Sequence, residues 1–326
     1  MSADLATLPG VTAAMAPGFE RFLTVIGALL AGSVVLGVVG WRAGPAIARR
    51  ARMVNRYLLL SVLSLVVLFP IYITLVNSLL PADKIAARPP TLFPSSWLWS
   101  GYAQAWNQGH VASYLWNSLV VTFFIVGGQL VTSIFAAYAF AFLDFPFKRT
   151  IFVVFLSTMM VPFEVVFFTN LDTVVSLGHV PVLGHFVHLD SYGALVVPFL
   201  ATGFGAFLVR QAFLSLPRDL RDAAELDGYG HMRFMWRVAV PLARPTIAAL
   251  ALFSFFDAWN QYLWPLVASD HYRTVQVGLR QLSRVSLDQI NVTFAGTVLA
   301  ALPLFILLLV FQKQLVRGLT AGAVKG

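Results

Sequence analysis

Residues 222 to 245 read DAAELDGYGHMRFMWRVAVPLARP. This stretch is charged and rich in turn-forming residues, and a long apolar run flanks it on each side. Charged side chains are costly inside a lipid bilayer, so in a membrane protein such a stretch lies outside the hydrocarbon. A structured loop of this kind, placed on one side of a bilayer, is typical of a protein that contacts a partner in the water phase.

The composition is that of an integral membrane protein. Of the 326 residues, 59% are hydrophobic and 11% are charged, whereas a soluble domain has about 25% charged residues. The chain contains no cysteine, which excludes disulfides, zinc–thiolate sites and cysteine catalysis. No run of interleaved basic and aromatic residues indicates nucleic-acid binding, so we attribute the net charge of +8 to arginines that set membrane topology.

The apolar stretches predict an all-α, polytopic membrane protein, because a helix needs about 20 apolar residues to cross the hydrocarbon core. Seven candidate spans lie at about 22–41, 57–80, 114–142, 150–171, 193–213, 246–267 and 292–312. We assign the first to an N-terminal extension, residues 1–50, and the other six to a second region, residues 51–326. A passive anchor is the simplest role for the first span. Packing through Gly27 and Ala31, or a true start at Met53, remains open.

The basic residues divide unevenly between the two sides of the predicted spans. Six lie on one side: Arg21, Lys84, Arg88, Arg273, Arg280 and Arg284. The other 16 lie on the opposite side: Arg42, Arg49, Arg50, Arg52, Arg56, Lys148, Arg149, Arg210, Arg218, Arg221, Arg233, Arg237, Arg244, Lys313, Arg317 and Lys325. Cytoplasmic loops carry an excess of lysine and arginine, so we expect the C-terminus and residues 215–245 in the cytoplasm and the N-terminus outside.

Residues 215–245, which we call the 215–245 loop, are expected to hold two short helices joined by a tight turn. Ser215 is a candidate cap, with Pro217 in the first turn. Gly228 is expected to end the first helix, because glycine accepts the left-handed conformation found at helix ends. A second stretch runs from Met232 to Pro241.

The charges of this loop allow two interpretations. Ala223 and Ala224 would give the first helix a flat outer face, and the acidic residues around them can pair within the loop or across an interface. Alternatively, the loop lies on the membrane surface and its charges are only solvated.

The spacing resembles the cytoplasmic coupling loop of the permease subunits of bacterial ATP-binding-cassette importers. That pattern is Glu-Ala-Ala-x-x-Asp-Gly, followed by Pro-Leu-x-x-Pro, and Asp222 stands where the family usually has Glu. The matching residues are Ala223, Ala224, Asp227, Gly228, Pro241, Leu242 and Pro245.

Further segments carry the resemblance over about residues 57–326. They are Asn117-Ser118, Ala137-Tyr-Ala-Phe-Ala141, Leu143-x-Phe145, Trp259-Asn260-x-x-x-x-Pro265 and the C-terminal run from Val316 to Gly326. The chain is most similar to carbohydrate-uptake permeases of the maltose and glycerol-3-phosphate type.

The resemblance implies a fold, a set of partners and a place in the cell. The fold is that of a type I importer permease, with six core helices and here one extra. The partners are a second permease subunit forming a heterodimer, two cytoplasmic ATP-binding subunits, an external solute-binding protein and a sugar or sugar-like solute. ATP and Mg would be bound by the ATPase subunits, with no cofactor on this chain. The location is the bacterial inner membrane, in contact with its lipid.

The resemblance also implies which residues contact the ATPase. They are Asp222, Ala223, Ala224, Glu225, Asp227, Gly228, Pro241 and Pro245. Closure of the ATPases on nucleotide would then move the membrane helices between inward-facing and outward-facing states.

Ionisable and polar residues within the spans are candidates for the substrate path. Glu164 and Asp257 are each predicted to lie just past the bilayer midplane. The remaining candidates are Asn117, Asn260, Gln261, Tyr262 and Trp264, whose amide and aromatic groups suit sugar hydroxyls. Pairing of the two acids with the partner permease is the alternative. Two acids are awkward for a phosphorylated solute unless the partner supplies arginine, so neutral sugar and glycerol phosphate both stay open.

The sequence does not indicate an enzyme. None of the four lysines follows a glycine, so the phosphate-binding Gly-Lys-Ser/Thr motif is missing. His185 and His188 have no evident third ligand, and we expect no metal site. The other transport class to be weighed is an ion-coupled secondary transporter that acts without an ATPase and uses Glu164 and Asp257 as its relay.

Overall fold

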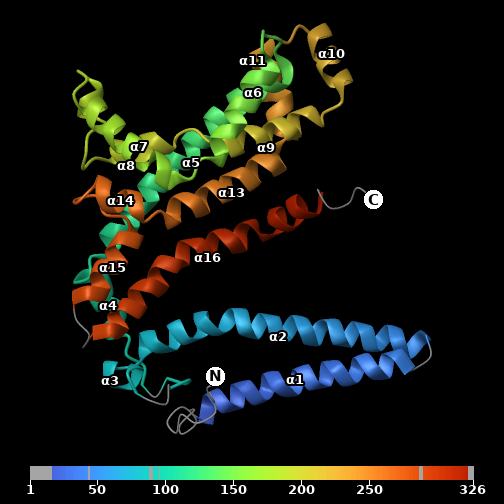
Figure 1. The fold of residues 1–326 in the computed structure, drawn as a ribbon, viewed down its shortest axis with the longest axis vertical. Helices are drawn as coiled ribbons and strands as arrows, with labels where there is room; N and C mark the ends of the chain where they lie inside the picture. Colours follow the sequence, from blue (N-terminus) through green and yellow to red (C-terminus); the bar gives the residue numbers. More distant parts are fainter. Residues whose placement is uncertain (1–16, 43–44, 88–90, 95, 286–288, 322–326) are drawn as a thin grey trace, which may run out of the picture. The chain divides into compact units, whose positions relative to one another are not determined.

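The computed structural model describes residues 17–42, 45–87, 91–94, 96–285 and 289–321. Every regular element in these ranges is helical, which confirms the predicted all-α fold (Figure 1). The start of the predicted N-terminal extension, residues 1–16, lies outside the described ranges. So do Arg88 and Lys325 of the charge analysis.

The chain divides into two compact units, and the first comprises residues 1–111 and 279–299. Its main feature is a helical hairpin in which α1 packs along α2, with the rings of Phe22 and Phe69 stacked at 4.3 Å. The helices of this unit are α1 (Pro17–Arg42), α2 (Pro45–Leu79), α3 (Ala82–Ile85) and α4 (Ser100–Asn107), together with parts of α15 (Val275–Val285) and α16 (Ile290–Ala321).

The second unit comprises residues 112–278 and 300–326 and contains both candidate sites. In Figure 1, α10 lies at one end of this unit, and α7 and α8 lie at the other. Its helices are α5 (Val111–Phe142), α6 (Lys148–Ser157), η1 (Thr158–Met160), α7 (Phe163–Gly178), η2 (Leu183–His185), α8 (Tyr192–Val196), η3 (Val197–Phe199), α9 (Gly203–Leu214), α10 (Arg218–Leu226), α11 (His231–Phe234), the π-helix η4 (Met235–Ala239), α12 (Val240–Leu242), α13 (Arg244–Asn260) and α14 (Leu263–Ala268).

Among the described residues, three helices are long and apolar enough to cross a membrane, within residues 48–79, 111–142 and 290–312. Three further spans result if each of three sharply bent helix pairs counts as one. These six correspond to the six later spans expected from the sequence. In the described residues, α1 has a shorter apolar part, Phe22–Leu36, so the extra N-terminal span stays a prediction. The predicted boundary after residue 50 falls inside α2, and that division also stays a prediction.

The bent pairs break at identifiable residues. The first bends by 101° between Met160 and Phe163, where Pro162 removes a backbone donor. The second bends by 47° between Phe199 and Gly203. The third bends by 79° at Ala243. The sequence predicted 150–171 as one continuous span, which is wrong because the chain turns sharply at Pro162.

Candidate functional sites: the 215–245 loop and a cavity at broken helices

α10 ends in a hydrogen-bonded cap built on a glycine. Gly228 has a φ of +73°, a conformation that costs other residues energy but not glycine. The Tyr229 amide donates to the Ala224 carbonyl at 2.8 Å, and the Gly228 amide donates to the Glu225 carbonyl at 3.0 Å. These two bonds form the Schellman arrangement. Gly228 therefore ends the helix as the sequence predicted.

The start of α10 differs from the prediction. The helix begins at Arg218 after Pro217, and no side chain caps it. Ser215 is instead the residue at the end of α9, where its hydroxyl donates to the Ala212 carbonyl at 2.7 Å. A serine two residues before a proline fits the end of one helix as well as the start of the next, so the sequence alone did not separate the two roles.

A buried cluster holds the 215–245 loop against α5 and α9. Phe213 is fully buried, and its ring centroid lies 5.8 Å from that of Phe142 and 6.4 Å from that of Tyr138. The cluster consists of Ile134, Ala137, Tyr138, Val209, Phe213, Ala224, Phe234, Met235, Ala239, Ala243 and Leu250. Because helices from both ends of the loop contribute to it, the loop is expected to move with α5 and α9 rather than independently of them.

The two alanines of the motif lie in different environments. Ala224 is 6% exposed and belongs to the buried cluster, whereas Ala223 is exposed. The expectation that both form an outward face is therefore wrong for Ala224, which instead lets α10 approach the body of the unit closely.

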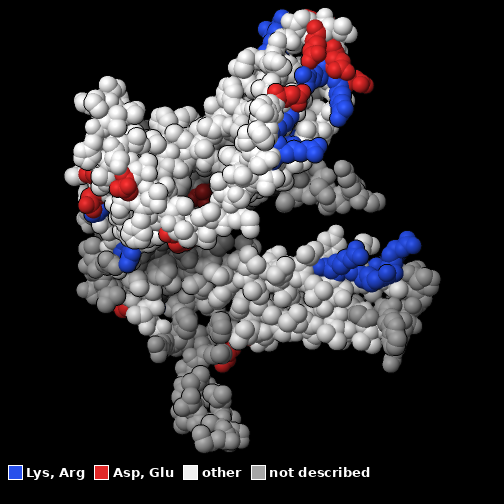
Figure 2. Space-filling model, turned by 45° about the horizontal axis from the view of Figure 1, so that its top comes forward, with Lys and Arg blue, Asp and Glu red and all other residues white. Residues whose placement is uncertain are grey.

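Some charged residues of α10 form ion pairs within the described part of the chain, and others do not. Arg221 donates to Glu225 at 2.9 Å and to the carbonyl of Phe142, the last residue of α5, at 3.1 Å. Asp222 is exposed and forms no ion pair within the described part of the chain. Acidic and basic side chains gather at this end of the unit (Figure 2). Asp222 is thus available to a partner, whereas Glu225 is already paired.

Sequence reasoning missed an apolar stripe on the outer side of α10. Leu220, Ala223 and Leu226 follow one another at a spacing of three residues, which places them along one side of a helix. Leu226 is 91% exposed and Leu220 is 39% exposed. The exposed side of α10 thus carries an apolar stripe within a charged loop, and this stripe is a candidate contact surface. The spacing was visible in the sequence, but which side of α10 faces outward was not.

The end of the loop leads directly into a long helix. Pro241 and Pro245 bracket the 79° bend at Ala243, and Ala243 is buried in the cluster. After the bend, α13 runs from Arg244 to Asn260. The two prolines therefore set the direction of α13 and lie at the bend, not on the outer stripe of α10.

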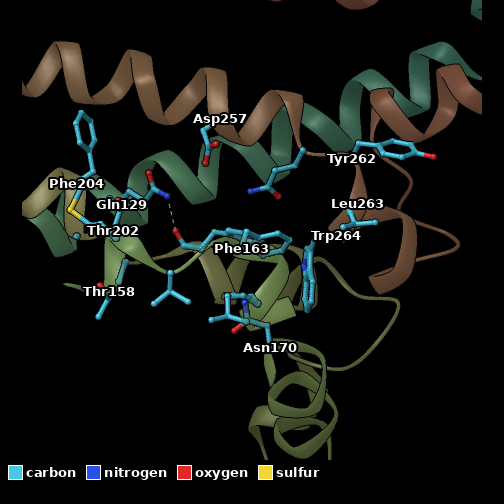
Figure 3. Close-up of a pocket in the computed structure, with 18 residues that line it drawn as sticks. Gln129, Thr158, Phe163, Asn170, Thr202, Phe204, Asp257, Tyr262, Leu263 and Trp264 are labelled. Atoms are coloured by element: carbon cyan, nitrogen blue, oxygen red, sulfur yellow. Dashed lines mark hydrogen bonds between the residues drawn. The ribbon is translucent and has the colours of Figure 1, made fainter. Parts of the chain in front are cut away.

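The second unit contains a cavity of about 600 Å³ where three helices are interrupted (Figure 3). We call it the Asp257 cavity. The break between η1 and α7, the break between η3 and α9, and the break between α13 and α14 all contribute lining residues. The lining residues are Gln129, Thr158, Met159, Val161, Phe163, Val166, Asn170, Pro198, Phe199, Ala201, Thr202, Gly203, Phe204, Asp257, Gln261, Tyr262, Leu263 and Trp264.

Polar side chains of α5 satisfy the backbone at one of these breaks. Gln129 donates its amide to the Phe199 carbonyl at 2.9 Å (Figure 3), and the Thr132 hydroxyl donates to the Leu200 carbonyl at 2.8 Å. Non-helical backbone at membrane depth is tolerated where such partners or a water-filled cavity are available. The break is therefore a stable feature of the fold, and it opens polar groups to the cavity.

The structure brings together four of the seven predicted substrate-path residues. Asp257, Gln261, Tyr262 and Trp264 line the cavity. Trp264 is 1% exposed, and its indole donates to the Ala194 carbonyl at 3.0 Å. It therefore fixes the wall of the cavity rather than offering a free ring.

The other three predicted residues do not line the cavity. Glu164 lies in the first turn of α7, directly after the break at Pro162, and it is exposed. Asn260 donates to the Phe256 carbonyl at 2.8 Å. The prediction placed Glu164 well inside one continuous helix, and the sharp turn at Pro162 makes that continuity wrong. Its depth in the membrane stays a prediction.

Asn117 takes part in hydrogen bonds that join α5 to the segments at Tyr192 and Arg273. Its side-chain amide donates to the Arg273 carbonyl at 3.1 Å and accepts a bond from the Tyr192 hydroxyl at 2.6 Å. Next to it, the Ser118 hydroxyl accepts a bond from the Val275 amide at 2.8 Å. Asn117 is therefore a structural residue, and its assignment to the substrate path is not supported by its contacts.

Asp190 forms the centre of a second set of hydrogen bonds, which we call the Asp190 cluster. Its carboxylate accepts bonds from the Ser269 hydroxyl at 2.6 Å and from the backbone amides of Asp270 and His271 at 2.9 and 2.8 Å, and it contacts the His271 ring. These bonds, the one from Ser269 above all, hold the pKa of Asp190 well below its usual range. The cluster fastens the segment before α8 to the segment after α14.

Sequence reasoning missed Gln129, Thr158, Asn170 and Thr202 as cavity residues. Each is polar and lies within an apolar run. Thr158 and Thr202 lie at helix interruptions, whereas Gln129 and Asn170 lie within α5 and α7. Only the structure shows that the three interruptions meet beside them.

Comparison with known proteins agrees with this architecture. Residues 129–321 match the family described as "Binding-protein-dependent transport system inner membrane component". The chain is 34% identical over 281 residues to the sn-glycerol-3-phosphate transport system permease protein UgpE of Yersinia pestis bv. Antiqua (strain Antiqua), covering 83% of this chain and 97% of that one. It is 32% identical over 266 residues to the UgpE of Brucella abortus (strain 2308), covering 78% and 91%.

A solved structure has the same fold. It is a bacterial ABC transporter involved in the import of the acidic polysaccharide alginate, with a TM-score of 0.69 and 22% identity, and the alignment covers 82% of this chain and 97% of that one.

The 215–245 loop, the broken apolar helices and the match over more than half of the chain lead to one conclusion: this chain belongs to the family of inner-membrane components of binding-protein-dependent transport systems and is a permease subunit of an ABC importer.

Proposed function

We propose that the chain is one of two permease subunits of an importer for a sugar or sugar-like solute, driven by two cytoplasmic ATPase subunits that dock on the 215–245 loop. The second permease is a related but different chain, and an external solute-binding protein delivers the solute. ATP and Mg are bound by the ATPases. The loop and the C-terminus are cytoplasmic, and the assembly lies in the bacterial inner membrane.

The observation that carries this proposal is the covalent path from the loop to the cavity. α13 begins at Arg244, directly after the buried bend at Ala243, and it carries Asp257 at the cavity wall. Thirteen residues of helix separate Arg244 from Asp257, about 20 Å at 1.5 Å per residue. A displacement of the loop therefore reaches the cavity through one rigid element.

The outer side of α10 offers the contact for the ATPase. Leu226 is almost fully exposed, Asp222 has no ion pair within the described residues, and the Gly228 cap fixes both on a short, rigid helix. An exposed apolar anchor surrounded by charges has the composition of a specific protein interface. Closure of the ATPases would push this helix, and α13 would carry the movement to the breaks that line the cavity.

The experiment is solute-stimulated ATP hydrolysis and uptake by the whole transporter in proteoliposomes. Asp222→Arg is expected to abolish both while the subunits stay inserted, because a reversed charge at the docking surface repels its partner. The same change at Asp83, an exposed residue of α3, serves as the control and should leave both activities intact.

Wild-type uptake by the Asp222→Arg transporter would refute the docking assignment. Uptake by the unmodified chain alone, in vesicles without ATP, would instead establish the ion-coupled secondary transporter.

A further inference from the structure

The lining of the Asp257 cavity has a distinct electrostatic character. Of the described residues that line it, Asp257 alone is charged, and none is lysine, arginine or histidine. Asp257 forms no ion pair or hydrogen bond with any described residue. In Figure 3 its carboxylate extends from α13 into the space opposite Phe163. Within the described residues of this chain, the carboxyl group of Asp257 therefore has no basic side chain beside it in the cavity.

The polar side chains around the cavity offer hydrogen-bond acceptors, and the amides of Gln129, Asn170 and Gln261 also carry donors. Asp257 has two carboxylate oxygens that accept only. The side-chain oxygen of Gln261 has no hydrogen-bond partner among the described residues. Thr158 gives its hydroxyl hydrogen to the Phe155 carbonyl at 2.7 Å, and Gln129 gives an amide hydrogen to the Phe199 carbonyl. Both groups retain acceptor capacity after these bonds.

A solute that matches this lining brings many hydroxyl donors and no negative charge. A phosphate or carboxylate would lose water beside Asp257 without an opposite charge from this chain to replace it, which disfavours binding. A volume of about 600 Å³ lies within the range of small-molecule sites, about 300–1,000 Å³. Hydroxyl groups also bind a carboxylate through charge-assisted bonds, which are the stronger kind.

We propose that this transporter carries an uncharged polyhydroxylated solute, a neutral saccharide or polyol, and that Asp257 binds its hydroxyl groups on the way through the membrane. The inference rests on the proposed function and narrows it. The proposed solute is uncharged, whereas the solutes in the names of two similar proteins are anionic: sn-glycerol 3-phosphate in one and an acidic polysaccharide in the other.

The test compares two matched substitutions, Asp257→Asn and Glu164→Gln, in the complete transporter with its binding protein. Each replaces a carboxylate by an amide of nearly equal size, but Glu164 does not line the cavity. The measurements are uptake of radiolabelled neutral saccharides and polyols, uptake of radiolabelled sn-glycerol 3-phosphate, and ATP hydrolysed per solute transported.

The unmodified transporter should take up a neutral compound of this panel and not sn-glycerol 3-phosphate. Asp257→Asn should lower the amount of neutral solute transported per ATP by about tenfold or more, the loss expected for one charge-assisted hydrogen bond. ATP hydrolysis should continue, because the 215–245 loop is unchanged, and a merely structural role for Asp257 would not separate the two readouts. For Glu164→Gln, the amount of solute transported per ATP should stay within about twofold of that of the unmodified transporter, because a surface substitution has an effect of about this size.

ATP-driven uptake of sn-glycerol 3-phosphate in preference to the neutral solutes would overturn the inference and leave the proposed function standing. Equal solute-to-ATP ratios for Asp257→Asn and Glu164→Gln would overturn it as well. Absence of ATP-driven uptake of every solute in the panel would overturn both.

Discussion

At the scale of single residues, Gly228 and Gly230 offer a matched test of the α10 cap. A Cβ at either position would meet no atom within 4 Å, yet only Gly228 has a positive φ. Gly228→Ala is therefore expected to cost about 1 kcal/mol through backbone strain alone, and Gly230→Ala should be close to neutral. The Gly228→Ala transporter should hydrolyse more ATP per solute, because the docking helix is less firmly capped.

Thermal unfolding of the purified assembly and the solute-to-ATP ratio are the two measurements for this pair. Equal behaviour of the two alanine variants would show that the Schellman cap does not matter for coupling.

The lowered pKa of Asp190 predicts that the stability of the Asp190 cluster depends on pH. The folded state lowers the pKa of Asp190 below the unfolded value of about 3.9, so the unfolded state binds more protons between those two values. The stabilisation is therefore complete above about pH 5 and is lost as pH falls through the folded pKa. The protection factors of residues 269–273 against hydrogen exchange, measured relative to the intrinsic exchange rate at each pH, should fall as pH is lowered from about 5 to about 3.

Two substitutions separate this effect from general acid unfolding. Asp190→Asn should give low protection factors for residues 269–273 at every pH. Asp270→Asn should keep the pH dependence, because the Asp270 backbone amide and the Asp190 carboxylate both remain. A pH profile that Asp190→Asn leaves unchanged would rule out this role for the Asp190 cluster.

At the scale of elements, the sequence predicted the helices more successfully than their interruptions. The length of the apolar runs was sufficient to predict six spans, because a run of about 20 apolar residues has few structures available other than a membrane helix. The break at Pro162 was not predicted, although proline at that position is a known reason for a helix to end. A proline inside a membrane helix is often tolerated, so the residue alone did not decide between a mild kink and a sharp turn.

The roles of some candidate site residues could be predicted from the local sequence, whereas the roles of others depend on the tertiary structure. The role of Gly228 follows from local backbone geometry, which the sequence encodes directly. The positions of Glu164 and Asn117 depend on which breaks and loops meet in three dimensions, and no single segment specifies that. Ala224 and Leu226 show the same limit within one short helix, because the outward side of α10 is set by the cluster beneath it.

The buried cluster predicts that the loop is held by core packing. Phe213→Ala removes a fully buried ring and should cost about 3–5 kcal/mol. Phe168→Ala removes a ring that is 74% exposed and should have a much smaller effect. The measurement is the thermal unfolding midpoint of each detergent-purified transporter, and an equal shift for the two variants would contradict the assignment of Phe213 to the core.

At the scale of the whole molecule, the charge distribution predicts which loops face the cytoplasm. The chain has no cysteine, so single cysteines report on topology without background. A thiol at Asp144, between α5 and α6, should be protected from a membrane-impermeant maleimide in intact cells with a permeabilised outer membrane. Thiols at Asp83 and Asp270 should be labelled. The opposite pattern would invert the proposed orientation and place the 215–245 loop outside.

Cross-linking from the 215–245 loop would show whether this loop contacts the ATPase. Asp219, an exposed residue in the first turn of α10, would be replaced by cysteine and modified with a photoreactive maleimide in the assembled transporter, with cysteine at Asp83 as the control. Mass spectrometry then identifies the captured chain. We expect a cross-link from position 219 to a nucleotide-binding subunit and none from position 83. An assembled ATPase that position 219 does not capture, or that both positions capture equally, would refute docking at α10.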